Sequence, residues 1–244
     1  MKVHNEFENL LDRLKEIEND PAQMQMVHCG IKGMAFFPGG RSLFGIDDRT
    51  ISNMEIMILG QDFDTLDKYQ IAVQNGEEDI LKNKTWKNLS KILEISNIPL
   101  MSCFFTNCLM GVRLTESAIG VSPGFKDLNF VKSCQELFLF QLALQKPKVV
   151  FALGIQVAKF LSPLSKDIEG WKSINSFLNL DSSNESSVKK NVQFEFNNNK
   201  ISVDIVLLMH PSARKFNLDK RTYKGLHGMD AQIQMIRDVY QTND

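Results

Sequence analysis

The feature that most constrains this chain is the apolar run in "EIMILGQDFD", residues 55 to 64, which stops abruptly at polar residues. Ile56 to Leu59 are typical of a parallel strand covered by helices on both faces, because such a strand is a near-continuous apolar run. Ligands of open α/β sheets bind just beyond the carboxyl ends of these strands. Asp62 therefore stands where a functional carboxylate is expected, although an Asp shortly after Gly also commonly forms a turn.

Three further segments have the same apolar character, namely "LMSCFFTN" at 100–107, "KVVFALG" at 148–154 and "ISVDIVLLMH" at 201–210. Helical periodicity separates them, for example over residues 128–145 and, before the first strand, over residues 4–19. This alternation predicts an α/β fold of three layers, α/β/α, with a central, mainly parallel four-stranded sheet.

We expect one domain over residues 1–244, in which an N-terminal helix and a glycine-rich loop (1–50) precede the core (51–244). In the core, Thr85 is the expected N-cap of the helix "TWKNLSKILEISN". The segment "VQFEF" is expected to form a hairpin with the last strand.

Composition excludes several classes of protein. A hydrophobic content of 43% and a charged content of 23% are ordinary for a globular protein. No apolar run approaches the roughly 20 residues that span a bilayer, and the N-terminus has no signal-peptide core, so we expect a cytoplasmic protein without membrane contact. We also expect it to be a monomer. The sequence contains neither a dinucleotide-binding nor a P-loop glycine motif, and its Cys and His residues lack metal-ligand spacing. We therefore expect neither a cofactor nor a metal.

Polar residues follow the predicted strands at corresponding positions: Asp62 after the first, Asn107 after the second and His210 after the fourth. Parallel strands bring these ends to one edge of the sheet. There a carboxylate can stabilise positive charge, an amide can recognise paired donors and acceptors, and an imidazole can donate to a developing oxyanion. Taken singly, Asn107 is also explained as a turn residue and His210 as a structural histidine.

The motifs around these residues resemble the uracil-DNA glycosylase superfamily. The stretch "LGQDF" resembles the family-one motif G-Q-D-P-Y, and "FFTNCLMGVRL" resembles the strand motif L-L-N followed by x-x-L-T-V-R. Further along, "VVFALGIQVAKFL" is similar to the third-strand segment and "MHPSARKFN" to the H-P-S-P-L-S loop. The order and wide spacing of the motifs agree over roughly residues 50 to 240.

The resemblance implies roles for individual residues. Asp62 would position water and stabilise the sugar cation, Asn107 would read the Watson–Crick edge of a flipped uracil, and His210 would hydrogen-bond the base O2. Asp62 and His210 are thus the expected catalytic residues. The other positions of these motifs are expected to line the substrate site with Asn107; they are Gly60, Gln61, Phe63, Asp64 and Ser212.

Two departures concern base recognition. Phe63 replaces the motif's proline, and we expect it either to stack on the base or to belong to the core. Asp64 replaces the tyrosine that blocks the thymine methyl in family-one enzymes, so it either leaves a roomier pocket or merely caps a turn.

A local positive excess follows the H-P-S loop in "RKFNLDKRTYK", although the net charge of the chain is −1. Its basic residues are the expected DNA contacts: Arg214, Lys215, Lys220, Arg221 and Lys224. Arg214 stands where family-one enzymes insert leucine, so it is expected to enter the space left by the flipped nucleotide.

We therefore expect a DNA glycosylase that removes uracil or a related damaged base from single- or double-stranded DNA. One alternative is a catalytically silent member of the same fold that only binds nucleic acid or a nucleotide. The other is an unrelated α/β hydrolase of small molecules.

Overall fold

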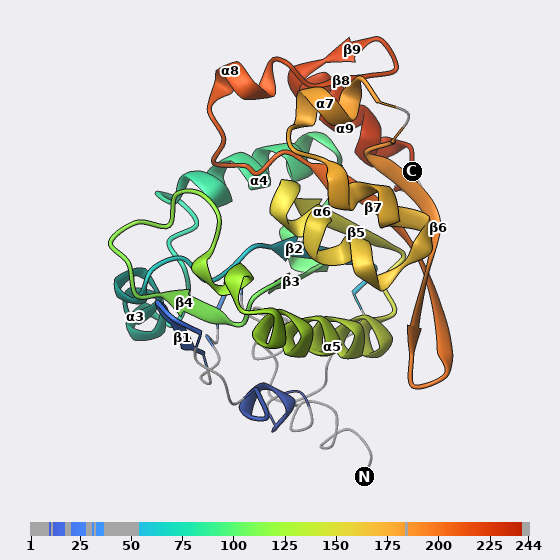
Figure 1. The fold of residues 1–244 in the computed structure, drawn as a ribbon. Helices are drawn as coiled ribbons and strands as arrows, with labels where there is room; N and C mark the ends of the chain where they lie inside the picture. Colours follow the sequence, from blue (N-terminus) through green and yellow to red (C-terminus); the bar gives the residue numbers. More distant parts are fainter. Residues whose placement is uncertain are drawn as a thin grey trace.

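The computed structural model describes residues 10, 12–17, 21–27, 31, 33–36, 54–183 and 185–240. Its centre is a five-stranded sheet with the strand order β3-β2-β5-β7-β6 (Figure 1). The strands are β2 (Ile56–Gly60), β3 (Cys103–Asn107), β5 (Val149–Leu153), β6 (Val188–Phe196) and β7 (Asn199–Leu208).

The sheet contains the four predicted parallel strands, but the predicted number of four is wrong because β6 adds a fifth. Strands β3, β2, β5 and β7 are parallel to their neighbours, and β6 pairs with β7 in the antiparallel sense. The β6–β7 turn contains Asn197 and Asn198, which both have positive φ angles, a conformation that Asn tolerates. The expected hairpin is therefore part of the central sheet and forms its edge.

Helices cover both faces of this sheet. Alternate residues of β2 point to opposite faces, so Met57 and Leu59 lie in one apolar cluster while Ile56 and Ile58 lie in the other. The first cluster includes side chains of α5 (Leu128–Gln145), α6 (Ile155–Leu161) and the 3-10 helix η4 (Lys166–Ser173). The second includes side chains of α4 (Lys84–Ile95) and α9 (Gly228–Arg237). The fold is thus the expected α/β/α arrangement (Figure 1).

Shorter elements lie around the sheet. Two small antiparallel pairs join β1 (Met24–Met26) to β4 (Gly111–Arg113) and β8 (Thr222–Tyr223) to β9 (Leu226–His227). The remaining elements are α3 (Leu66–Asn75), α7 (Phe177–Asp181), α8 (Lys215–Leu218), η1 (Leu100–Ser102), η2 (Pro123–Lys126) and η3 (Ser162–Leu164).

Two local expectations differ from the structure. Helix α3 lies in a stretch that sequence analysis leaves without an element, because α3 is largely exposed and buries only Ala72. The N-cap of α4 is Asn83, whose side chain accepts a hydrogen bond from the backbone N–H of Thr85, so the prediction of Thr85 as the cap is wrong.

The N-terminal helix is described only in part. Residues 12–15 are helical, and Leu10, Leu14 and Ile17 are buried in the first apolar cluster. Glu16 forms a turn and Ile17 follows it, so the helix ends before the expected residue 19. The remaining residues of the expected 4–19 helix, and most of the glycine-rich loop, lie outside the described residues. Within the described ranges, no helix has both the length and the apolar character needed to cross a membrane.

Candidate functional site

The carboxyl ends of β2, β3, β5 and β7 bring the predicted site residues to one edge of the sheet. Gly60 pairs in register with Asn107. A Cβ atom at Gly60 would overlap Asn107 Oδ1, so the glycine leaves the space that the Asn107 side chain occupies at the end of β2. Gly154, after β5, lies beside His210: a Cβ atom built on this glycine would be 3.6 Å from His210 Cβ. The sequence prediction that these ends converge agrees with this geometry.

Asp62, directly after β2, forms an ion pair with Arg113 at the end of β4. Arg113 Nε lies 2.7 Å from Asp62 Oδ2, and the two side chains are only 2% and 6% exposed. The backbone N–H of Asp64 lies 3.3 Å from the other oxygen, Oδ1. Because Arg113 holds Oδ2, the carboxylate has a fixed orientation. Sequence analysis missed Arg113, although it lies inside the quoted motif "FFTNCLMGVRL".

Arg113 also connects Asp62 to the loop between β4 and η2. Its Nη2 donates to Gly120 O at 3.1 Å, and Nη1 lies 3.5 Å from Ile119 O. Gln61 Nε2 donates to the same Gly120 carbonyl at 3.1 Å. The predicted substrate residue Gln61 therefore helps to hold this loop against the site.

Asn107 is buried, with 1% of its surface exposed, beside Phe36. Its Nδ2 donates to the Phe36 carbonyl at 2.6 Å. Phe36 N–H in turn donates to Glu78 Oε1 at 3.0 Å. Glu78 also accepts from Trp86 Nε1, and burial raises its pKa. In this conformation the Asn107 amide is bound within the protein, so reading a base edge requires the Phe36 carbonyl to move or to be replaced as its acceptor.

His210 is neutral near pH 7, because burial, followed by the charge of Arg113, lowers its pKa to about 4, against a smaller opposing effect of Asp64. The backbone N–H of Ser212 lies 3.2 Å from His210 Nδ1 and donates to it, and Ser212 Oγ lies 2.8 Å from the same nitrogen. A nitrogen that accepts from a backbone N–H carries no proton itself, so we assign the proton to Nε2. His210 can therefore offer an Nε2–H donor.

Helix α4 fixes the loop that carries His210. Lys84 Nζ donates to the carbonyls of Ser212 at 2.8 Å and Ala213 at 3.3 Å. Asn88 Nδ2 donates to Pro211 O at 2.7 Å. These contacts connect residues more than 120 positions apart, and nothing in the sequence indicated them.

Phe63 and Asp64 make contacts that are largely structural. Phe63 is buried in the first apolar cluster, and its ring lies edge-on to Tyr69 with 6.4 Å between centroids. Asp64 has a φ angle of +71°, and its Oδ1 accepts from the backbone N–H of Thr65 at 2.7 Å. These contacts favour a core role for Phe63 over stacking on a base. For Asp64 they favour a turn-forming role over a role in enlarging the pocket. Asp64 nevertheless lies close enough to His210 to act on its pKa.

Four of the five basic residues after the H-P-S loop are exposed. Arg214 precedes α8, Lys215 pairs with Asp219 within that region, and Lys224 lies 2.7 Å from Asp238. Lys220 Nζ lies 3.9 Å from the centre of the exposed Phe216 ring. The segment thus presents cations and an aromatic ring to solvent.

Arg221, the fifth, is fully buried. Its Nε donates to Asp181 Oδ2 at 2.9 Å, Nη2 donates to Ser187 Oγ at 2.8 Å, and the guanidinium lies 4.2 Å from the Phe177 ring centre. These internal contacts leave no surface for a phosphate, so we omit Arg221 from the proposed DNA contacts.

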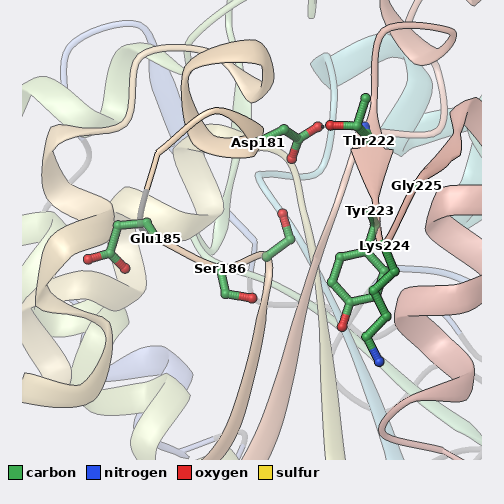
Figure 2. Close-up of a pocket in the computed structure, with 8 residues that line it drawn as sticks. Asp181, Glu185, Ser186, Thr222, Tyr223, Lys224 and Gly225 are labelled. Carbon is green, nitrogen blue, oxygen red and sulfur yellow. Dashed lines mark hydrogen bonds between the residues drawn. The ribbon is translucent and has the colours of Figure 1, made fainter.

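A pocket of about 220 Å³ lies beside this buried ion pair. Figure 2 shows Asp181 directed at the backbone of Thr222, which donates to Asp181 Oδ2 at 2.9 Å. Two further charged residues of the lining are also paired, Glu185 with Lys189 and Lys224 with Asp238. The charged side chains that line the pocket are thus already paired within the protein, and we assign the pocket no ligand.

No protein-family model matches the chain, and no curated protein matches it either. Across the described part of the chain, no group of three or more His, Cys, Asp or Glu side chains is placed to hold a metal ion. The assignment of function therefore depends on the geometry of the strand ends and on the motifs that they carry.

The close approach of Gly60 and Asn107 leads to a first prediction. A Gly60→Ala variant should force Asn107 Oδ1 to move and should lower activity by about 10- to 100-fold, since a misplacement of about 1 Å in a site can cost that much. A double-mutant cycle with Asn107→Ala checks the cause. In the Asn107→Ala background, Gly60→Ala should have little further effect; an equal reduction in both backgrounds would contradict this account.

Proposed function

We propose that this chain is a DNA glycosylase that hydrolyses the N-glycosidic bond of uracil, or of a related damaged base, flipped out of DNA. The observation that carries the proposal is the convergence of Asp62, Asn107 and a neutral His210 at one edge of the sheet. The exposed cations after His210 support DNA as the substrate.

This set of residues matches the charges that develop in the reaction. Breaking the glycosidic bond leaves a cationic, oxocarbenium-like sugar and an anionic base. In the proposed mechanism the Asp62 carboxylate stabilises the sugar and orients the attacking water. The Nε2–H group of His210 donates to the base oxygen that gains negative charge, while the imidazole itself stays neutral.

Arg113 has a positioning role in this mechanism. It binds Asp62 Oδ2, and Oδ1, which accepts from the Asp64 N–H, keeps a second lone pair for a water molecule or the sugar. Asn107 would recognise the base edge after exchanging its bond to the Phe36 carbonyl for bonds to the base.

The experiment that tests the proposal is a screen of oligonucleotides that carry different lesions, among them uracil and 5-hydroxymethyluracil, followed by alkaline cleavage at abasic sites. Cleavage at one or more lesions supports the proposal. Tight DNA binding without cleavage at any lesion would support a catalytically silent binding protein. Failure to bind DNA even at low salt would favour a hydrolase of small molecules.

The proposed DNA surface predicts the salt dependence of binding. Arg214→Ala and Lys220→Ala should each weaken duplex binding and reduce the slope of log K against log salt by about 0.9 for each phosphate that the variant no longer neutralises. Lys132→Ala, at an exposed position of α5, is the matched control and should leave the slope unchanged. Unchanged slopes in all three variants would place the DNA elsewhere.

The low pKa of His210 predicts how stability depends on pH. Its folded-state pKa is about 4, below its ordinary value of 6.5, so between these values the unfolded chain binds the extra proton. The contribution of His210 to the free energy of unfolding should therefore be constant above about pH 6.5 and should fall as the pH drops from 6.5 toward 4. Urea unfolding at several pH values checks this. His210→Gln should flatten that part of the profile, and an identical profile in the variant would refute the assignment.

A further inference from the structure

We propose that the loop of residues 114–121 is a second DNA-contacting element, in which Ile119 inserts as an apolar wedge against the base stack beside the flipped nucleotide. This inference rests on the proposed function, and it adds a contact surface that lies outside the basic segment after His210.

The loop exposes apolar side chains. Ile119 is 93% exposed, the highest value among the large hydrophobic residues in the described part of the chain. Leu114 and Val121 in the same loop are 52% and 55% exposed. Single exposed apolar residues are common on protein surfaces, so exposure alone assigns no role. This loop differs from such ordinary surface positions in its location beside Asp62 and in the hydrogen bonds that hold its backbone.

The loop is held by residues that flank the proposed catalytic carboxylate. Arg113, which pairs with Asp62, also contacts the carbonyls of Ile119 and Gly120, and Gln61 donates to Gly120 O as well. Within the loop, the Ile119 N–H donates to Ser117 Oγ at 3.2 Å. The backbone that carries Ile119 is therefore fixed relative to Asp62, and its side chain points away from this support into solvent.

The charge of the loop indicates which part of DNA it would meet. The segment "LTESAIGV" has one acidic residue, Glu116, and no basic residue, so it is poorly suited to bind phosphates. The stacked bases are the apolar part of a duplex, and proteins that kink or open DNA insert side chains such as Ile, Leu or Phe between them. An exposed Ile side chain on a backbone held at the rim of the site fits this chemistry.

The test compares excision of the same lesion from duplex and from single-stranded oligonucleotide. Ile119→Ala should slow single-turnover excision from the duplex by about tenfold, because a wedge acts only where a stack must be opened. The single-stranded rate should stay within about twofold of wild type, and Ile119→Phe should restore the duplex rate. Leu128→Ala, at another exposed apolar position (77% exposed) on α5, is the matched control and should change neither rate.

Three results would overturn the inference. Equal reductions on both substrates would mean that Ile119 acts by positioning Asp62 through Arg113. Unchanged rates on both would mean that the loop does not open the stack. Self-association of the wild type that Ile119→Ala abolishes would assign the loop to a contact between copies of the chain. A duplex with 2-aminopurine beside the lesion gives a readout that needs no excision: wild type should raise its fluorescence on binding and Ile119→Ala should not. Absence of excision by the wild type would thus count against the proposed function alone.

Discussion

Replacement of Asp62 by Asn is expected to lower single-turnover base excision by at least about 100-fold, because an amide cannot supply the negative charge that stabilises the sugar cation. DNA binding should remain largely intact. Asn keeps an oxygen that can accept from Arg113 Nε, but it leaves the buried guanidinium without a counter-charge. Some loss of stability is therefore expected with the loss of activity.

A double variant separates these two effects. Asp62→Asn combined with Arg113→Gln removes both charges of the buried pair, so it should recover stability while excision stays low. Asp67→Asn, at an exposed position of α3, is the control for the same substitution nearby and should leave excision unchanged. Excision at the wild-type rate by the double variant would show that the pair is only structural.

Arg221→Met is expected to destabilise the fold by about 3–5 kcal/mol, since it removes one partner of a buried ion pair and leaves the Asp181 carboxylate without its cation. For a domain of this size, that corresponds to a fall in Tm of roughly 6–20 °C. Thermal unfolding measures the effect.

Lys224→Met provides the matched comparison for Arg221. Lys224 forms an ion pair with Asp238 in the same segment, but its side chain is 62% exposed, so its loss should change stability by about 1 kcal/mol or less. At a temperature where both variants are folded, Arg221→Met should show the wild-type salt dependence of DNA binding. If Arg221→Met instead had wild-type stability and a weaker salt dependence of DNA binding, Arg221 would be a DNA contact after all.

The layout of the sheet could be predicted from the sequence because its parallel strands are buried on both faces. Strands β2 and β5 are uniformly apolar and uniformly buried, so the sequence indicated both their position and their polar ends. Strand β6 alternates between buried residues such as Phe194 and exposed neighbours, which indicated a hairpin but not its place in the sheet. Helix α3 was missed because its inward face is narrow: Leu66, Tyr69 and Ala72 pack toward the first apolar cluster, whereas most of the helix is exposed.

The partners of the site residues could not be predicted, because they depend on contacts between distant segments. The bond from Asn107 to Phe36 spans 71 positions, and the bond from Asn88 to Pro211 spans 123. Arg221 is the reverse case: the sequence predicts a surface contact, and the fold buries the side chain. In the sequence it is one of several cations in a basic run, whereas the fold turns it inward toward Asp181.

The proposed hydrolysis gives two products, a free base and an abasic site, and both can be counted in one experiment. Wild-type protein is incubated in excess with a uracil-containing oligonucleotide, single-stranded and duplex, and free base is quantified by mass spectrometry alongside abasic sites. The account predicts one free base for each abasic site, with formation of both depending on Asp62. DNA that is bound but remains intact, with neither free base nor abasic sites across the lesion series, would contradict it.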